Sequence, residues 1–241
     1  MGFIILIAIW QTISLVGGYN TALFPTPSQV LDAIISLIKN GTLFEHFQVS
    51  MYRFLAGYLS AVVIAIILGL ILGRISILWG VIDPIVQLLR PVSPTAWSPF
   101  IVLWFGIGDM PAIVIIFIAA FFPVLLSTVS AVGKVDKTYL KLAQNLELKG
   151  FELLRKIIFP AAFPYIANGL HIAVGTAWIF LVAGEMVGTQ SGLGYLIVDA
   201  RNSLRLDLVM EGILFIGATG LILDKAVGLF ETWINRIWGR A

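Results

Sequence analysis

The chain has 241 residues, of which 59% are hydrophobic and only 12% are charged, and its mean hydropathy is +1.00. A soluble domain of this length needs more charged surface, whereas lipid tolerates an apolar exterior and penalises each charge. The composition therefore predicts an all-α integral membrane protein. Cysteine is absent, which excludes disulfides and thiol chemistry, and the net charge of +2 does not indicate a nucleic-acid partner.

Six apolar stretches are long enough to cross a bilayer, which takes about 20 residues in a helix. They lie at roughly 2–19, 52–73, 81–105, 110–132, 164–187 and 208–231. The third stretch must be broken, because Arg90 and three prolines interrupt it before residue 100. We therefore expect six transmembrane helices, one of them discontinuous.

A less apolar segment at approximately 20–50 separates the first two stretches. Pro27 stands at a helix start, apolar residues follow at 30, 31, 34, 35 and 38, and Asn40 and Gly41 form a stop signal. This pattern predicts a short amphipathic helix on the extracytoplasmic membrane surface.

Lysine and arginine fix the orientation, because segments rich in them stay in the cytoplasm. With the N-terminus inside, the cytoplasmic cations are Arg74, Lys134, Lys137, Lys141, Lys149, Arg155, Lys156, Arg236 and Arg240. Only Lys39, Arg53, Arg201 and Arg205 then lie outside. Both termini are predicted to be cytoplasmic, and 134–163 becomes the longest inner loop.

This loop is amphipathic. Apolar residues recur at helical spacing, Gly150 permits a turn, and the pattern then resumes. The residues are Tyr139, Leu140, Leu142, Ala143, Leu146, Leu153, Leu154, Ile157 and Ile158. Two short helices with a bend are predicted. Charge alone does not distinguish a docking surface from a connector that lies on the lipid headgroups.

Polar side chains inside the spans are candidates for a translocation path, because they are costly in lipid. His171, Trp178 and Glu185 are seven residues apart and share one helical stripe, whereas Gly169, Ala173 and Ala177 form an opposite, closely packing face. The alternative for His171 and Glu185 is that they lie at the membrane–water interfaces and have no role in the path. In the last stretch, Glu211 and Asp224 are expected near the ends or in local pairs, such as Asp224 with Lys225.

Arg90 is the strongest candidate for contact with an anion, since its guanidinium can donate two parallel hydrogen bonds to an oxyanion. The alternative is that Arg90 pairs with Asp83 or binds backbone carbonyls at the break. Trp97 is a further candidate for the path, although tryptophan is also common at membrane interfaces.

The inner loop resembles the coupling motif of the membrane subunits of ATP-binding-cassette (ABC) importers. That motif has Glu-Ala-Ala, three residues, Gly, nine residues and Ile-x-Leu-Pro. Aligned on Pro160, Ala143 and Ile157 match, Phe159 stands at the Leu position, and Glu147 replaces the glycine. Gly150 is expected to supply the bend instead. The resemblance implies that this loop, including Arg155, docks an ATPase.

Further blocks along the chain resemble the permeases of nitrate, bicarbonate, taurine and aliphatic-sulfonate importers. They are Phe24-Pro-Thr-Pro-Ser-Gln-Val30, Met51-Tyr-Arg-Phe-Leu-Ala-Gly57, Leu89-Arg-Pro-Val-Ser-Pro-Thr-Ala-Trp97, Trp104-Phe-Gly-Ile-Gly108, Phe121-Phe-Pro-Val124, Ala183-Gly-Glu-Met186 and Ser191-Gly-Leu-Gly-Tyr195. The resemblance implies a type I ABC importer permease fold, one permease domain over 1–241, and a translocation path for a small anion.

The chain lacks the G-x-x-x-x-G-K-[ST] loop of ATPases, so the family resemblance places ATP and Mg on a partner chain. It implies a non-enzymatic subunit in the cell membrane with four partners: two ABC ATPase subunits, a second permease copy in a homodimer, and an extracytoplasmic substrate-binding protein.

Three alternatives stay open at this point. Related permeases carry riboflavin or thiamine precursors, so the solute can differ. A secondary carrier that works without ATP would need an inverted repeat and buried carboxylates near the midplane. A membrane-embedded enzyme would need clustered His, Asp or Glu, and the two histidines, His46 and His171, are far apart in the chain.

Overall fold

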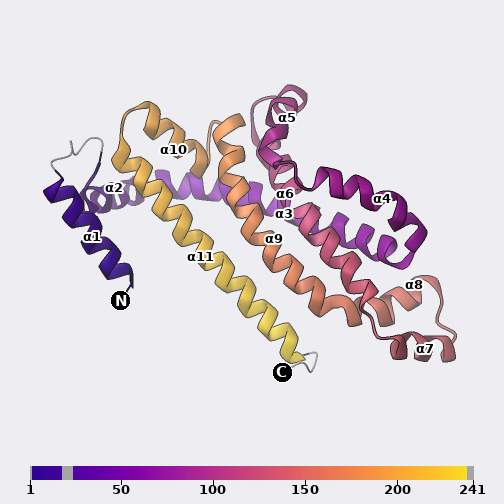
Figure 1. Cartoon of the computed structure of the whole chain (residues 1–241). Helices are drawn as coiled ribbons and strands as arrows, with labels where there is room; N and C mark the ends of the chain where they lie inside the picture. Colours follow the sequence, from indigo (N-terminus) through magenta and orange to yellow (C-terminus); the bar gives the residue numbers. More distant parts are fainter. Residues whose placement is uncertain (1, 18–23, 238–241) are drawn as a thin grey trace.

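The computed structural model describes residues 2–17 and 24–237, and every regular element in this part of the chain is helical (Figure 1). The elements are α1 (Gly2–Val16), α2 (Pro27–Lys39), α3 (Thr42–Arg74), α4 (Ser76–Leu89), η1 (Pro94–Trp97), α5 (Ser98–Phe105), α6 (Asp109–Gly133), α7 (Lys137–Asn145), α8 (Gly150–Leu153), η2 (Leu154–Ile158), α9 (Phe159–Gly188), α10 (Leu193–Asn202) and α11 (Leu206–Ile237).

Four helices in the described part are long and apolar enough to cross a membrane: α3, α6, α11 and the continuous helix from α8 through α9. They correspond to the second, fourth, sixth and fifth predicted spans. α1 has only 15 residues, and residues 18 and 19 of its predicted span lie outside the described part. The predicted count of six full spans is therefore not reached by the described helices.

The third predicted span is broken, as expected. α4 ends at Leu89, a short 3-10 helix begins at Pro94, and α5 has proline in its first turn. A proline ring cannot donate a backbone hydrogen bond and disfavours helical backbone in the residue before it. The prolines at 91, 94 and 99 therefore divide one predicted span into α4, the short 3-10 helix η1 and α5.

The fifth predicted span begins earlier than 164, because helical backbone continues from Gly150 to Gly188. The residues directly before α9 form a π-helix, η2, which ends beside Pro160. Such wide turns occur where a regular hydrogen-bond ladder is interrupted, and Pro160 has no N–H to donate. The proline thus modifies the helix without ending it.

α2 forms the helix that was predicted between the first two spans. Thr26 and Gln29 form a reciprocal capping box, and Pro27 occupies the first turn. Val30, Ala33 and Leu37 are buried, and α2 packs against α11. Leu31 and Ile38, which belong to the predicted apolar set, are exposed, so only part of the predicted apolar face is packed. Residues 20–23 of the predicted segment lie outside the described part.

α6 packs against both α3 and α9 and is the central helix of the bundle (Figure 1). Small residues permit this close contact. A Cβ atom at Gly69 of α3 would lie 2.6 Å from Cβ of Thr128 on α6, and one at Gly169 of α9 would collide with Ser127. The predicted packing face of α9 is confirmed, since Ala173 and Ala177 are also fully buried.

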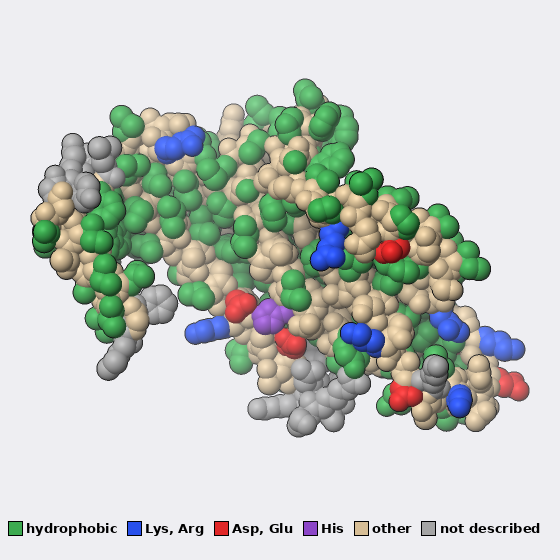
Figure 2. All heavy atoms as spheres, viewed as in Figure 1, with side chains coloured by type: hydrophobic (Ala, Val, Ile, Leu, Met, Phe, Trp, Pro, Cys, Tyr) green, Lys and Arg blue, Asp and Glu red, His purple; other side chains and the backbone are tan. Residues whose placement is uncertain are grey.

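The charged segments lie toward one end of the bundle. α7 and α8 lie beyond the ends of α6 and α9 (Figure 1), and Figure 2 shows most of the visible charged side chains along that side, with apolar side chains over much of the remaining surface. Of the two short helices that were predicted for the inner loop, α7 is a separate helix, whereas α8 is the start of the continuous helix that runs through η2 into α9; the predicted bend lies between α7 and α8.

Candidate functional site

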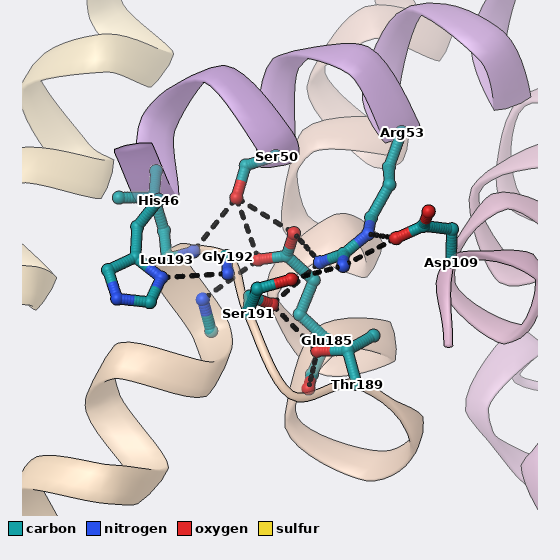
Figure 3. Close-up of polar contacts among 10 residues, drawn as sticks. His46, Ser50, Arg53, Asp109, Glu185, Thr189, Ser191, Gly192 and Leu193 are labelled. Atoms are coloured by element: carbon teal, nitrogen blue, oxygen red, sulfur yellow. Dashed lines mark hydrogen bonds and ion pairs between the residues drawn. The ribbon is translucent and has the colours of Figure 1, made fainter. Parts of the chain in front are cut away.

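A buried arginine joins three helices at the end of the bundle opposite α7 and α8 (Figure 3). Arg53 of α3 is 1% exposed. Its Nη1 donates to Oε1 of Glu185 on α9 at 2.9 Å, and its Nε donates to Oδ1 of Asp109 on α6 at 2.8 Å. One guanidinium therefore ties the start of α6 and the end of α9 to α3.

The carboxylate of Glu185 has further donors. The hydroxyl of Ser50 lies 2.8 and 2.9 Å from its two oxygens, and the Gly194 N–H donates to Oε2 at 2.9 Å. The Ser50 oxygen in turn accepts from the Leu193 N–H at 2.8 Å. Buried charge is stable only when it is paired and hydrogen-bonded, and the Glu185 carboxylate satisfies both conditions.

The loop between α9 and α10 closes over this pair. Nη1 and Nη2 of Arg53 donate to the carbonyl and the hydroxyl of Ser191, each at 2.7 Å. Nδ1 of His46 accepts from the Gly192 N–H at 2.9 Å. Gly192 has φ +103°, and a Cβ there would collide with the Glu185 carboxylate. Glycine is therefore required for the loop to approach the pair.

The cluster that we call the outer network consists of His46, Ser50, Arg53, Asp109, Glu185, Ser191, Gly192, Leu193 and Gly194. The sequence placed Arg53 among the outer cations and Glu185 on a path stripe, and it identified no link between them. The structure adds that Arg53 is buried by its partners. The sequence signal that could have indicated this network is the set of blocks that resemble importer permeases. Four of these blocks contain a residue of the outer network or lie directly beside one.

Arg90 lies in a different place. It lines a groove of about 520 Å³ between α6 and α9, whose walls run from Pro123 to Lys134 and from Tyr165 to Thr176. An adjoining cavity of about 280 Å³ also contains Arg90. Asp83 accepts a hydrogen bond from Gln87, and within the described residues the Arg90 side chain has no ion pair or hydrogen bond; only its backbone N–H donates, to the Val86 carbonyl at 2.9 Å. The alternative pairing with Asp83 is therefore not formed.

The other path candidates have packing partners. Nε1 of Trp178 donates to the Ile216 carbonyl of α11 at 3.1 Å, and its ring packs edge-on against Phe54. Trp97 is half-buried beside Phe100. Neither residue, nor His171, nor Glu185, lines the two cavities that contain Arg90. The stripe predicted for α9 faces α3 and α11.

α11 contributes carboxylates that the sequence assigned differently. His171 lies between two of them, with Nε2 3.0 Å from Oδ1 of Asp224 and Nδ1 2.9 Å from Oε2 of Glu231. The expected pair of Asp224 with Lys225 is replaced by this contact between helices. Glu211 is fully buried, and its two oxygens have no hydrogen-bond partner within the described residues.

The inner loop has a specific backbone geometry at Glu147. The N–H groups of Glu147 and Leu148 donate to the carbonyls of Gln144 and Ala143 at 3.0 and 2.9 Å, which is the Schellman arrangement at the end of α7. Glu147 has φ 54°, the left-handed conformation that glycine adopts most easily. The bend therefore occurs at Glu147 as well as at Gly150, which has φ 56°, and has not simply moved to Gly150.

One side of the loop is exposed and apolar. Ala143 and Ile158 are buried, whereas Leu142, Leu146 and Phe151 are exposed, Phe151 by 74%. At the start of α7 the Thr138 N–H donates to Asp136 at 2.7 Å, which caps the helix and lowers the pKa of that carboxyl. Among the other predicted docking residues, Arg155 is exposed, and Ile157, Phe159 and Pro160 are half-buried.

Comparisons with known proteins agree with this architecture. Residues 61–237 match the family model described as binding-protein-dependent transport system inner membrane component. The putative aliphatic sulfonates transport permease protein SsuC of Bacillus subtilis is 36% identical over 227 residues, which cover 94% of this chain and 82% of the relative. The nitrate import permease protein NrtB of Leptolyngbya laminosa is 35% identical over 239 residues, covering 96% and 85%.

A solved structure shares the fold. A chain of the MetNI methionine ABC transporter in inward-facing conformations superimposes with a TM-score of 0.58 at 16% identity, covering 77% of this chain and 96% of that one. The long apolar helices and the permease relatives together make this chain a multi-pass membrane protein of the transport class. The chain belongs to the family of binding-protein-dependent transport system inner membrane components.

Proposed function

We propose that this chain is the membrane subunit of an ATP-driven importer, with α7, α8 and η2 as the segment that docks an ATPase. The single observation that supports this best is the exposed apolar side of that segment, with Leu142, Leu146 and Phe151, held at one end of the bundle by the buried Ala143 and Ile158. An amphipathic helix of this kind fits a groove on a partner protein.

The complete transporter then contains two copies of this chain, two ATPases that hold ATP and Mg, and a soluble protein that delivers the solute. In the proposed orientation, α7 and both termini are cytoplasmic and the outer network is extracytoplasmic. Closure of the paired ATPases moves the docked segments and rocks the bundle between inward-open and outward-open states. Residues 1 and 238–241, at the two termini, lie outside the described part.

The proposed solute is a small anion of the nitrate, bicarbonate or sulfonate class. This is supported by two relatives, one named as an aliphatic sulfonates transport permease and one as a nitrate import permease, and by the unpaired guanidinium of Arg90 in the groove. The catalytic work of ATP hydrolysis belongs to the partner, so the chain acts as a transport subunit.

A docking experiment tests the importer role. Phe151→Asp places a charge on the most exposed apolar side chain of the segment and should abolish copurification of the ATPase. Leu204→Asp is the matched control, because Leu204 is 79% exposed and directly follows α10, which lies at the opposite end of the bundle from α7 and α8 (Figure 1). ATPase binding that survives in Phe151→Asp, in a Pro160→Asp variant and in an Arg155→Glu/Lys156→Glu double variant would refute the docking assignment.

A further inference from the structure

The groove beside Arg90 carries positive charge from two helices. Arg90 caps the end of α4, and Lys134 caps the end of α6, next to the inner loop. Both line the same groove, and neither that groove nor the adjoining cavity is lined by an aspartate or a glutamate. The walls around both cavities therefore favour anions over cations.

Neutral donors lie between the two cations. Ser127 and Ser130 of α6 and Asn168 of α9 line the groove, and their side chains make no hydrogen bond to another side chain or carbonyl in the described part of the chain. Hydroxyl and amide groups of this kind can donate to an oxyanion that has lost part of its water. Thr176 differs, because its hydroxyl is bonded to the Ala173 carbonyl at 3.0 Å.

Lys134 is held in place by an aromatic ring. Its Nζ lies 5.5 Å from the centroid of the Tyr165 ring, across the groove on α9. A cation–π contact orients an ammonium group, and the N–H groups that point away from the ring stay available to donate. Arg90 has a planar guanidinium group instead, whose parallel N–H groups can donate to two oxygens of one oxyanion.

We propose that the groove binds a small oxyanion between Arg90 and Lys134, and that Lys134, positioned by Tyr165, is the inner cation from which the anion leaves. The chemical class is a compact ion with several equivalent oxygens, such as nitrate or an alkanesulfonate. The physiological meaning of this inference rests on the proposed permease role. Among the groove residues, only Arg90 was a candidate before; the inference adds Lys134, Ser127, Ser130 and Asn168.

The absence of cysteine from the chain permits a direct test. A single Ser130→Cys substitution places a thiol inside the groove, and Ser28→Cys places one on the exposed surface of α2 as a control. The purified transporter is treated with an anionic and a cationic methanethiosulfonate reagent of similar size. The ratio of the two reaction rates at position 130, divided by the ratio at position 28, measures the electrostatic potential of the groove.

We expect this ratio to favour the anionic reagent by about tenfold, the lower end of what a charged cleft does to local ion concentration. In the Arg90→Gln/Lys134→Gln background it should fall to the control value, whereas Lys134→Arg should retain it. Nitrate or methanesulfonate, used as the probe anion, should slow labelling at position 130 and leave position 28 unaffected. Arg74→Gln removes a cation at the end of α3 outside the groove and should change neither result.

Uptake gives a second readout. Lys134→Gln should raise the KM for the transported anion about tenfold, the expected loss for one charged hydrogen bond, with ATPase binding unchanged. A labelling ratio equal to the control, or one that persists without both cations, would overturn the anion groove. That result would not contradict the importer role. If the importer role itself is wrong, the chain will fail to bind the ATPase while the labelling ratio keeps its expected value.

Discussion

Nη1 of Arg53 lies 2.9 Å from Oε1 of Glu185, and neither side chain has more than 1% of its surface exposed. The pair joins α3 to α9 across 132 positions of sequence. Burial of both charges makes the contact sensitive to the loss of either partner, since Arg53 without Glu185 keeps only the half-exposed Asp109 as an ionic partner.

We predict that Glu185→Ala lowers the free energy of unfolding by about 3–5 kcal/mol, the usual cost of breaking a buried ion pair by removing one member. The measurement is thermal unfolding of the purified transporter in detergent. Asp109→Asn is the matched control, because the Asp109 side chain also contacts Arg53 but is 53% exposed. Asp109→Asn should lower the free energy of unfolding clearly less than Glu185→Ala does. Equal decreases would show that the burial of Glu185 does not determine the loss of stability.

A second prediction concerns Gly192. Gly192→Ala should destabilise the outer network by about 1–3 kcal/mol, because φ +103° is strained for alanine and the new Cβ collides with the Glu185 carboxylate. Gly175→Ala in α9 is the control, since a Cβ there meets nothing within 4 Å and alanine favours helix by about 1 kcal/mol. Comparable destabilisation by both substitutions would contradict this account.

The sequence predicted the spans in α3, α6, α9 and α11, because long apolar stretches need little tertiary information. It also predicted the break after Arg90, since proline acts locally on the backbone. The outer network was different: Ser50, Arg53, Asp109 and Ser191 are ordinary residues in three separate segments, and only the packing of α3, α6 and α9 brings them together. The stripe of His171, Trp178 and Glu185 was a real face of the helix, but periodicity alone does not say what that face contacts.

The third prediction separates the effect of the left-handed backbone conformation at Glu147 from the effect of its carboxylate charge. Glu147→Gly should stabilise the end of α7 by about 1 kcal/mol, because glycine adopts the left-handed conformation without the Cβ penalty. Glu147→Ala also removes the carboxylate but keeps the Cβ, so it should not stabilise. Amide hydrogen exchange of α7 measures the difference. If the amides of α7 are equally protected from exchange in the glycine and alanine variants, any change in stability comes from loss of the carboxylate and not from the backbone conformation.

The last prediction concerns the polar contact between α9 and the inner half of α11. His171 has a carboxylate within 3.0 Å of each ring nitrogen, one from Asp224 and one from Glu231. Both carboxylates only accept when ionised, so an imidazolium that donates from both nitrogens satisfies the arrangement. The contacts are partly exposed, with 29% of the His171 side chain accessible, and solvent screening limits their strength.

A double-mutant cycle of His171→Leu and Glu231→Gln should therefore give a coupling free energy of about 1 kcal/mol. The cycle of His171→Leu with Glu152→Gln is the control, because Glu152 pairs with Lys156 on the inner loop and not with His171. Its coupling should be zero within error. A coupling in the control cycle as large as in the first would mean that His171→Leu perturbs the bundle globally, and the pairing with Glu231 would then not explain how α11 is held against α9.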